Sequence, residues 1–383
     1  MKKIGVIGSG FSGCIIANEL AKTGKYIIDI YEARHHIGGN CYTEKDPETG
    51  VMVHAYGPHI FNTSKKDIWD YVNTLTSFKP YINRVKAVTD KGIFPLPINL
   101  RTINLFFGEN FTPAEAETFI DSLADKTIAD PQSFEEQALR FVGKALYENF
   151  FKGYTLKQWG IHPQHLPASI LKRLPVRFTD DDNYYNSTYQ GIPTSGYTPI
   201  FQKLLDHPHI TLHLNKKFTR QTHGAAHDYI FYSGPIDAYF DYKIGKLQYR
   251  TLRFERHTQE GSFQGSAVVN YCQQEIPYTR ISEHKFFTPW EHHTQTVYFK
   301  EYSSLAQDND TPYYPIRLLD DKALLEAYEK LAVEEKKVSF MGRLGTYRYL
   351  DMDVVIAESL DIASKCATLP MEQWPTFPQS TSK

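Results

Sequence analysis

The 383-residue chain has few cysteines, no long apolar run and almost no net charge. Its four cysteines (Cys14, Cys41, Cys272 and Cys366) show no Cys-x-x-Cys spacing and no local histidine partner. We therefore expect no disulfide framework and no metal site, but buried thiols in a reduced, cytoplasmic protein. No stretch of about 18 or more apolar residues occurs, so no membrane span is expected. The balance of 42 basic and 44 acidic side chains argues against a nucleic-acid partner, because neutralising phosphates needs a basic surface.

Tyrosine, in contrast, is abundant, with 26 Tyr beside 24 Phe and 4 Trp. A buried phenol must find a hydrogen-bond partner, which an apolar ring does not need. The excess is consistent either with a large aromatic-lined cleft or with a tyrosine-rich core, and composition alone leaves both open. The chain length suggests two or three domains at roughly 150 residues each.

The first 32 residues have the pattern of a dinucleotide-binding unit. A strand (residues 2–7), a glycine-rich turn, a helix and a second strand (residues 26–31) follow one another. In the G-x-G-x-x-G turn, the glycines allow a tight turn, the approach of a pyrophosphate and close packing of the helix on the strand. These glycines are Gly8, Gly10 and Gly13. Glu32 ends the second strand, where its carboxylate is placed to accept a hydrogen bond from a ribose hydroxyl.

A second glycine pair, Gly38 and Gly39, follows Glu32 closely, and a late glycine turn at residues 342–345 precedes an apolar helix that starts at about residue 351. This extension resembles the FAD-binding two-dinucleotide-domain families, which include amine oxidases, rather than simple nicotinamide dehydrogenases. We therefore favour FAD and expect the early and late segments to rejoin in one discontinuous domain.

The middle of the chain divides by its periodicity. Residues 65–170 read as helical, with capping boxes at Thr112 and Ser133, residues 208–300 read as strands, and residues 318–338 read again as helical. We expect an α/β protein with an FAD-binding Rossmann-like domain, a helical insertion domain and an antiparallel β-sheet domain. The expected boundaries are 1–75 for the first FAD-binding segment, completed by 210–245 and 318–366; 76–175 for the mainly helical domain with a mobile substrate loop; 176–317 for the interleaved sheet domain; and 367–383 for a disordered tail.

Several strings of polar and aromatic residues are unusual for an ordinary core. They include FFKGYTLKQWG (150–160), YGPHIF (56–61) and GRLGTYRYLDMD (342–353), together with 174–178, 180–185, 189–191 and 313–315. Together these strings resemble the bacterial UDP-galactopyranose mutases, a family of flavoenzymes. The resemblance runs from the first strand to about Cys366.

The resemblance implies an isomerase that interconverts UDP-galactopyranose and UDP-galactofuranose for cell-surface polysaccharide synthesis, with the N-acetylgalactosamine forms left open. It implies FAD that must be reduced, whose N5 atom attacks the anomeric carbon and expels UDP. It also implies a homodimer and an unidentified reductant for the flavin. The side chains suit this chemistry, because expelling a diphosphate needs charge-stabilising donors such as arginine.

The resemblance also implies roles for single residues. Arg173 and Arg280 are implied as diphosphate clamps and His59 as the histidine beside the flavin, and these three are the catalytic candidates. The implied substrate contacts are Asn83, Tyr154, Thr155, Trp159, Arg173, Tyr184, Tyr185, Asn270, Arg280, Tyr314 and Tyr349. The implied cofactor contacts are Gly8, Gly10, Phe11, Ser12, Gly13, Glu32, Ala33, Gly39, Asn40, His59, Ile60, Phe218, Arg343, Leu350, Asp351 and Met352. Asn62 stands where relatives usually carry a second histidine, so its role is open.

Two alternatives remain from the residues alone. An FAD-dependent amine oxidase or desaturase would explain the glycine turns but not the arginine and tyrosine set. A non-catalytic binding protein that resembles the Rab GDP-dissociation inhibitors would share the fold without using flavin, although the intact glycines and Glu32 argue against it. Within the mutase interpretation, Gly153 and Gly160 bracket Trp159, which suggests a mobile lid.

Overall fold

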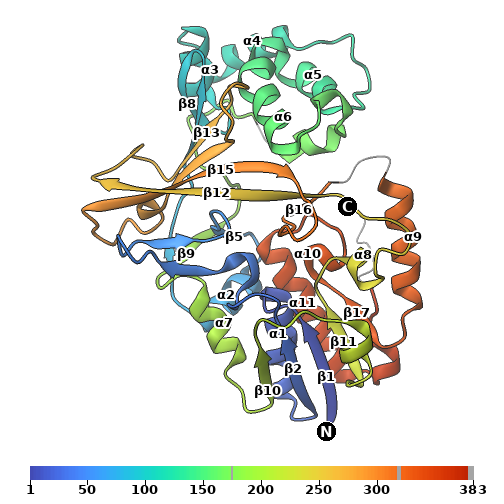
Figure 1. Ribbon diagram of the computed structural model, residues 1–383. Helices are drawn as coiled ribbons and strands as arrows, with labels where there is room; N and C mark the ends of the chain where they lie inside the picture. Colours follow the sequence, from blue (N-terminus) through green and yellow to red (C-terminus); the bar gives the residue numbers. More distant parts are fainter. Residues whose placement is uncertain (174–175, 317–320, 378–383) are drawn as a thin grey trace.

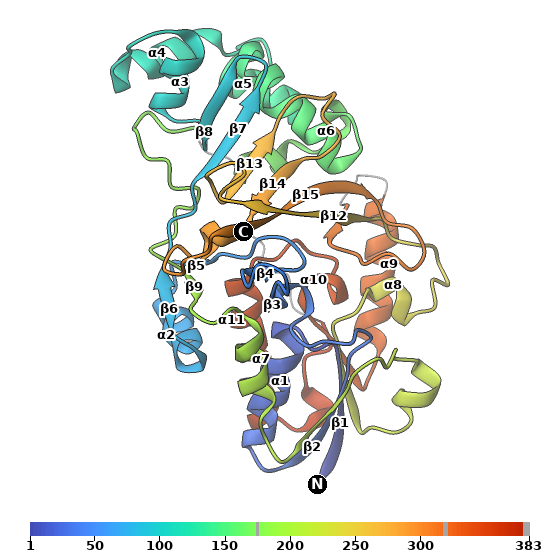
Figure 2. The same cartoon turned by 60° about the vertical axis from the view of Figure 1, so that its left-hand side comes forward.

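The computed structural model describes residues 1–173, 176–316 and 321–377, and its elements form three stacked layers (Figure 1). A parallel sheet with flanking helices lies at one end, a long sheet crosses the middle, and a group of helices lies at the other end. A view turned by 60° shows the same order of layers (Figure 2). Over the described part of the chain, no helix combines the length and the apolar character needed to cross a membrane.

The parallel sheet has the strand order β10-β2-β1-β11-β17, and each neighbouring pair is parallel. Its strands are β1 (Lys2–Ile7), β2 (Tyr26–Tyr31), β10 (Ile210–His213), β11 (Tyr229–Tyr232) and β17 (Val338–Phe340). The helices α1 (Phe11–Lys22) and α11 (Met352–Thr368) pack against one another beside it. Segments from the beginning, middle and end of the chain therefore share one Rossmann-like layer, which confirms the predicted fold class.

The middle sheet has the order β16-β12-β15-β14-β13-β7-β8. Its strands are β7 (Val85–Thr89), β8 (Gly92–Leu96), β12 (Tyr249–Glu260), β13 (Val268–Tyr271), β14 (Arg280–Glu283), β15 (Gln295–Leu305) and β16 (Tyr314–Pro315). The pairing of β13 with β7 is parallel, and the others are antiparallel.

Two expectations about this sheet are corrected. It is not wholly antiparallel, and β7 and β8 come from the segment that was predicted to be mainly helical. Val85, Ala87 and Thr89 are buried at every second position, which is the period of a strand. That short alternation was hidden between longer helical patterns, and pairing with the distant β13 gives the strand its place.

The helical layer contains α3 (Leu100–Phe107), α4 (Pro113–Leu123), α5 (Phe134–Leu146) and α6 (Gly153–Trp159), with a π-helical turn at Tyr147–Lys152. Both predicted capping boxes are present, at Thr112 with Glu115 and at Ser133 with Glu136. Each places a side-chain oxygen on an otherwise unpaired N–H group at the start of a helix.

The remaining elements connect the layers. The strands β3 (Thr43–Lys45) and β4 (Met52–His54) form a hairpin, and β5 (Phe61–Thr63), β9 (Tyr189–Pro193) and β6 (Phe78–Pro80) form a small sheet. The other helices are α2 (Lys66–Leu75), α7 (Thr198–Leu205), α8 (Ile236–Tyr239), α9 (Asp321–Glu334) and α10 (Gly342–Gly345).

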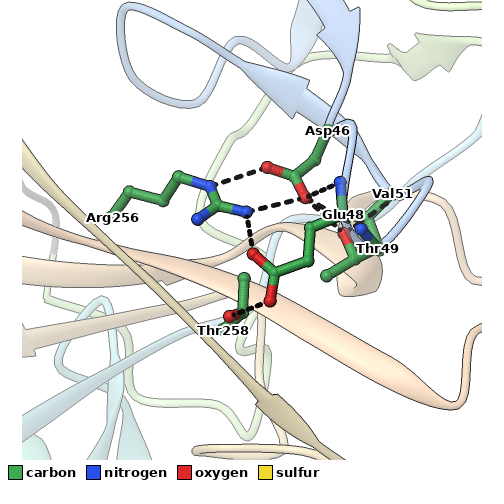
Figure 3. A network of polar contacts seen from close by, with 6 residues as sticks. All are labelled: Asp46, Glu48, Thr49, Val51, Arg256 and Thr258. Carbon is green, nitrogen blue, oxygen red and sulfur yellow. Dashed lines mark hydrogen bonds and ion pairs between the residues drawn. The ribbon is translucent and has the colours of Figure 1, made fainter.

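Arg256 of β12 ties the β3–β4 hairpin to the middle sheet (Figure 3). Its Nε donates to Asp46 Oδ2 over 2.7 Å, and its Nη2 donates to Asp46 Oδ1 over 3.0 Å and to Glu48 Oε2 over 2.7 Å. Burial alone would raise the pKa of Asp46, but the hydrogen bonds from Arg256 and Thr49 lower it to about 2. This ionised network fixes the hairpin just before the segment at residues 56–61.

The expected disordered tail is wrong for residues 367–377. Trp374 is buried against Tyr26 and Tyr229, and the Phe340 N–H group donates to the Thr376 carbonyl oxygen over 2.8 Å. One large apolar ring anchors a segment whose proline and polar composition suggested disorder. Residues 378–383 lie outside the described residues.

Candidate active site

The early glycine turns form a main-chain cradle at the N-terminus of α1. A Cβ atom on Gly13 would lie 1.9 Å from the Gly8 carbonyl oxygen, and one on Gly39 would lie 3.2 Å from Gly10 Cα. Only glycine permits these approaches. The N–H groups and the positive dipole end of the helix point out of this turn, which suits a pyrophosphate.

Glu32 is buried behind this turn, and its carboxylate already accepts three hydrogen bonds. Oε2 accepts from the Ser9 N–H group and the Ser9 hydroxyl, each at 2.9 Å, and Oε1 accepts from the Arg34 N–H group at 3.0 Å. The acid therefore holds the glycine turn in place. A carboxylate offers about four lone-pair sites, so it retains capacity for the predicted ribose hydroxyl. Its neighbour Ala33 is exposed.

The late glycine turn lies against the early one. Gly342 has a φ of +69°, and a Cβ atom there would lie 2.6 Å from Ser12 Oγ. Arg343 donates to the Leu350 carbonyl oxygen over 2.6 Å, which fixes the main chain just before α11 begins at Met352. The predicted cofactor residues that gather at these turns are Gly8, Gly10, Ser12, Gly13, Gly39, Arg343, Leu350, Asp351 and Met352.

Four predicted cofactor residues use their side chains elsewhere. Phe11 packs on Phe201, Ile60 is buried in an apolar cluster, Phe218 stacks on Tyr239, and Asn40 accepts a hydrogen bond from Arg34 Nη2. Any cofactor contact from Phe11 and Ile60 would therefore use main-chain atoms.

His59 is a neutral histidine with a fixed tautomer. Its Nδ1 lies 2.7 Å from the Gly57 carbonyl oxygen, which can only accept, so Nδ1 carries the proton. Burial lowers the pKa of His59 to about 4, against the Gly57 hydrogen bond, and Arg343 and Arg280 lower it further. The single ring proton is thus committed to Gly57, and Nε2 is an acceptor. The histidine that the resemblance implies beside the flavin would therefore accept a hydrogen bond at Nε2 rather than donate one.

Arg280, on β14, is held by Glu301, which lies opposite it on β15. Arg280 Nε donates to Glu301 Oε2 over 2.8 Å, and the Glu301 side chain is only 1% exposed. Burial alone would lower the pKa of Arg280, but Glu301, Tyr154 and Tyr314 raise it well above its ordinary value. The guanidinium is therefore permanently charged, and it lies beside two tyrosine rings.

An aromatic pocket with a volume of about 110 Å³ is lined in part by Asn270, which pairs with Arg280 across β13 and β14. Its wall contains five predicted substrate residues, which are Tyr154, Thr155, Trp159, Tyr184 and Asn270. The rest of the wall is mainly apolar and comes from β8 and its continuation, α5, the π-helical turn and Cys272. The side-chain oxygens of Asn83 and Asn270 are buried without a hydrogen-bond partner among the described residues. Such acceptors suit a ligand that brings its own N–H or O–H donors.

Tyrosine rings connect this pocket to the cofactor cradle. Tyr314 and Tyr349 stack with ring centroids 5.7 Å apart, and the Arg343 guanidinium lies 5.5 and 4.8 Å from their centroids. Burial raises the pKa of Tyr314 to about 12, so its hydroxyl is a neutral donor at physiological pH. Tyr185 packs edge-on against Tyr184, with centroids 5.5 Å apart. A chain of neighbouring side chains therefore leads from Tyr154 in the pocket, past Arg280, to Arg343 at the late glycine turn.

Comparison with known proteins decides the family. A sequence model described as UDP-galactopyranose mutase matches residues 149–349, and one described as an NAD(P)-binding Rossmann-like domain matches residues 6–75. A probable UDP-galactopyranose mutase from Klebsiella pneumoniae is 53% identical, over 98% of each chain. The chain belongs to the UDP-galactopyranose mutase family.

Members of this family are isomerases, and this chain is such an enzyme. A dTDP-fucopyranose mutase from Escherichia coli is 50% identical over 95% of this chain and 98% of its own length. The crystal structure of a reduced UDP-galactopyranose mutase has a TM-score of 0.74 at 16% identity, covering 97% of this chain and 96% of its own. That likeness supports the fold.

Within this mutase-family site, two sequence-based assignments remain open. The side chain of Arg173 lies outside the described residues, so its predicted clamp role stays a prediction. Asn62 Oδ1 accepts a hydrogen bond from Ser187 Oγ over 2.8 Å, which gives this side chain a structural use between β5 and the segment before β9.

Glu301 is the residue that sequence reasoning missed. The available signal was an acid close after the apolar run Val297 to Phe299, within the strand at residues 295–305. An acid there needs a buried cation, and Arg280 is one. The apolar pocket wall from Leu96 to Ile98 was also missed, because this short segment carries no motif.

Proposed function

We propose that the protein interconverts UDP-galactopyranose and UDP-galactofuranose with FAD in its reduced form. The observation that carries this proposal is the arrangement of Arg280, Tyr314 and Tyr349 between an aromatic pocket and a dinucleotide cradle. The pocket suits a nucleobase, because rings from Tyr154 and Trp159 can pack on its faces. The diphosphate would then lie beside Arg280, and the sugar would lie on the side of the glycine turns.

The residues fit FAD. The glycine cradle leaves no room for a Cβ atom at Gly13, α1 directs its N-terminus at the turn, and Arg34 Nη1 is buried nearby without a hydrogen-bond partner among the described atoms. Gly10, Gly39 and Arg343 would hold the cofactor, with Glu32 on its ribose. When bound and reduced, the flavin supplies the nucleophile at N5 for the anomeric carbon.

The protein's own groups stabilise the departing diphosphate. Arg280 is charged at every physiological pH and is oriented by Glu301, so no reorganisation is needed when charge develops. Tyr314 is a neutral hydroxyl donor beside it. Arg173 would be the second clamp. His59 is neutral, so it adds no positive charge near the anomeric carbon.

The proposal also specifies which sugar and which nucleobase the substrate carries. The 53% identical relative is named for UDP-galactopyranose and the 50% identical relative for dTDP-fucopyranose, so both substrates belong in the test. The N-acetylgalactosamine form is a third candidate. We further propose a cytoplasmic homodimer that depends on a cellular reductant and serves cell-surface polysaccharide synthesis, as in the family that it resembles.

The test is a turnover assay on the purified flavoprotein. Its absorbance spectrum is recorded, the flavin is reduced with dithionite, and products from UDP-galactofuranose, dTDP-fucofuranose and the N-acetylated sugar are separated by chromatography. We expect conversion of UDP-galactofuranose only after reduction. Equal rates with oxidised flavin would contradict the proposal, hydrogen peroxide formation would favour the amine oxidase alternative, and a colourless protein that takes up no FAD would favour a binding protein.

A further inference from the structure

α6 is the short helix that brings Tyr154, Thr155 and Trp159 into the pocket, and two cations outside the proposed chemistry hold it in place. A helix of seven residues is too short to be stable by itself, so tertiary contacts must fix its position. The two cations are Lys157, within the helix, and Arg250, on β12.

Lys157 binds three main-chain oxygens, one at the end of β13 and two in the segment that joins β13 to β14. Its Nζ donates to the carbonyl oxygens of Tyr271 (2.8 Å), Gln273 (2.7 Å) and Tyr278 (3.0 Å). An ammonium group has three protons, so all of its donors are used. A Cβ atom on Gly153 would lie 2.2 Å from the Cys272 carbonyl oxygen, which shows that the helix and this segment are in close contact.

The segment held by Lys157 connects two parts of the candidate site. The strand before it carries Asn270 in the pocket wall, and the strand after it begins with Arg280. One ammonium group therefore joins the helix that carries Trp159 to the hairpin that carries the predicted diphosphate clamp.

Arg250 fixes the other end of α6. The last carbonyl groups of a helix lack intrahelical partners, and a cation is favoured there by the helix dipole. Arg250 Nε donates to the Gln158 carbonyl oxygen over 3.0 Å, Nη2 donates to the Lys157 carbonyl oxygen over 3.3 Å, and Ser303 Oγ donates to the same Gln158 oxygen over 2.7 Å. A Cβ atom on Gly160 would lie 2.6 Å from Arg250 Nη1, so the two groups are in direct contact.

We propose that Lys157 and Arg250 are positioning residues that set the position of α6 and thereby couple the nucleotide pocket to Arg280. The inference rests on the proposed function, because it takes the pocket as the nucleotide site. Nucleotide affinity then depends on an ammonium group that does not line the pocket and is bound to the β13–β14 hairpin.

The test measures the affinity of the flavin-loaded protein for UDP by isothermal titration calorimetry. Lys157→Met removes the ammonium group at similar length, and Lys157→Arg keeps a cation that can donate to the same oxygens. Lys152→Met is the matched control, since Lys152 lies just before α6 and its side chain makes no hydrogen bond or ion pair with the described residues. We expect Lys157→Met to weaken UDP binding and to raise the substrate KM by about 10- to 100-fold. Lys157→Arg should recover most of the affinity, and the control should stay within about twofold of the wild type.

A double-mutant cycle separates positioning from general destabilisation. If Lys157 acts through α6, then Lys157→Met should cost much less UDP affinity in a Trp159→Ala background, because the ring that it positions is gone. Additive losses would overturn the inference. If Lys157→Met does not fold, Arg250→Gln removes the cation that binds the last carbonyl groups of α6, and an unchanged UDP affinity in that variant would equally overturn the inference.

The outcome also distinguishes this inference from the proposed function. If the wild type binds UDP and Lys157→Met binds it equally well, only the positioning role is wrong. If the wild type binds no UDP, the proposed function fails and the inference fails with it. Unchanged flavin content in each variant confirms that the cofactor cradle is intact.

Discussion

Arg280 offers the sharpest test of the site, because its substitution has two separable effects. Arg280→Met removes the guanidinium that would face the diphosphate. A hydrogen bond to a charged group contributes about 1.5–3 kcal/mol, so kcat/KM should fall about 10- to 150-fold from one lost contact, and further if two are lost. The same change leaves Glu301, which is 1% exposed, without its cation. Breaking a buried ion pair in this way costs about 3–5 kcal/mol of folding free energy.

A second substitution removes the stability effect without restoring the chemistry. In Arg280→Met/Glu301→Gln the buried charge is gone, so the free energy of unfolding should return toward the wild-type value while turnover stays low. The assay combines urea unfolding, flavin absorbance and chromatographic turnover with reduced flavin, and Glu301→Gln alone is the control. We expect that single variant to keep flavin and to lose less turnover than Arg280→Met, because the guanidinium remains.

Two results would refute this reasoning. Turnover of the double variant within about threefold of the wild type would remove Arg280 from the site. Loss of flavin in the double variant would show that the arginine supports the cofactor cradle rather than the diphosphate.

Three further predictions concern the cradle, one buried histidine and the hairpin network. Gly13→Ala places a Cβ atom 1.9 Å from a main-chain oxygen of the same turn, so the purified protein should lose its flavin absorbance, whereas a yellow protein would contradict the assigned cradle. Burial lowers the pKa of His284 to about 3, so between pH 8 and 5 this residue gains a proton in the unfolded chain but not in the folded chain. The free energy of unfolding should therefore decrease as the pH is lowered from 8 to 5. His284→Gln should reduce that decrease by about 2 kcal/mol in urea titrations. Asp46→Asn weakens the charge-assisted hydrogen bonds from Arg256, so the free energy of unfolding in urea at pH 7 should decrease by about 1.5–3 kcal/mol. An unchanged free energy of unfolding would contradict a structural role for this network.

The glycine turns could be predicted from the sequence because their chemistry is local. Gly8, Gly10 and Gly13 are close in the chain, and the need for a bare main chain follows from the strand–turn–helix order. The helix caps at Thr112 and Ser133 are equally local, and both are confirmed. The number of strands in the middle sheet could not be predicted, because β7 takes its place by pairing with a strand 183 residues further along the chain, as in the pair of Val85 with Val268.

The candidate site likewise contains residues that the sequence predicted and residues that only the structure revealed. Motif resemblance identified Tyr154, Trp159 and Asn270, and the structure brings them into one pocket. It did not identify Glu301 or the tautomer of His59, because both depend on which group lies opposite in space. A carboxylate becomes a partner of Arg280 only when two strands pair in the observed register.

The sequence by itself determined the family, the dinucleotide cradle and the five polar or aromatic residues of the pocket wall that the motifs carry, since short strings with demanding local geometry encode them. Only the tertiary structure decided how the parts are held. The Glu301–Arg280 pair, the anchoring of α6 by Lys157 and Arg250, and the burial of Trp374 each join segments that are distant in the chain. Their strength comes from the removal of water around paired groups, and burial is a property that no local string contains.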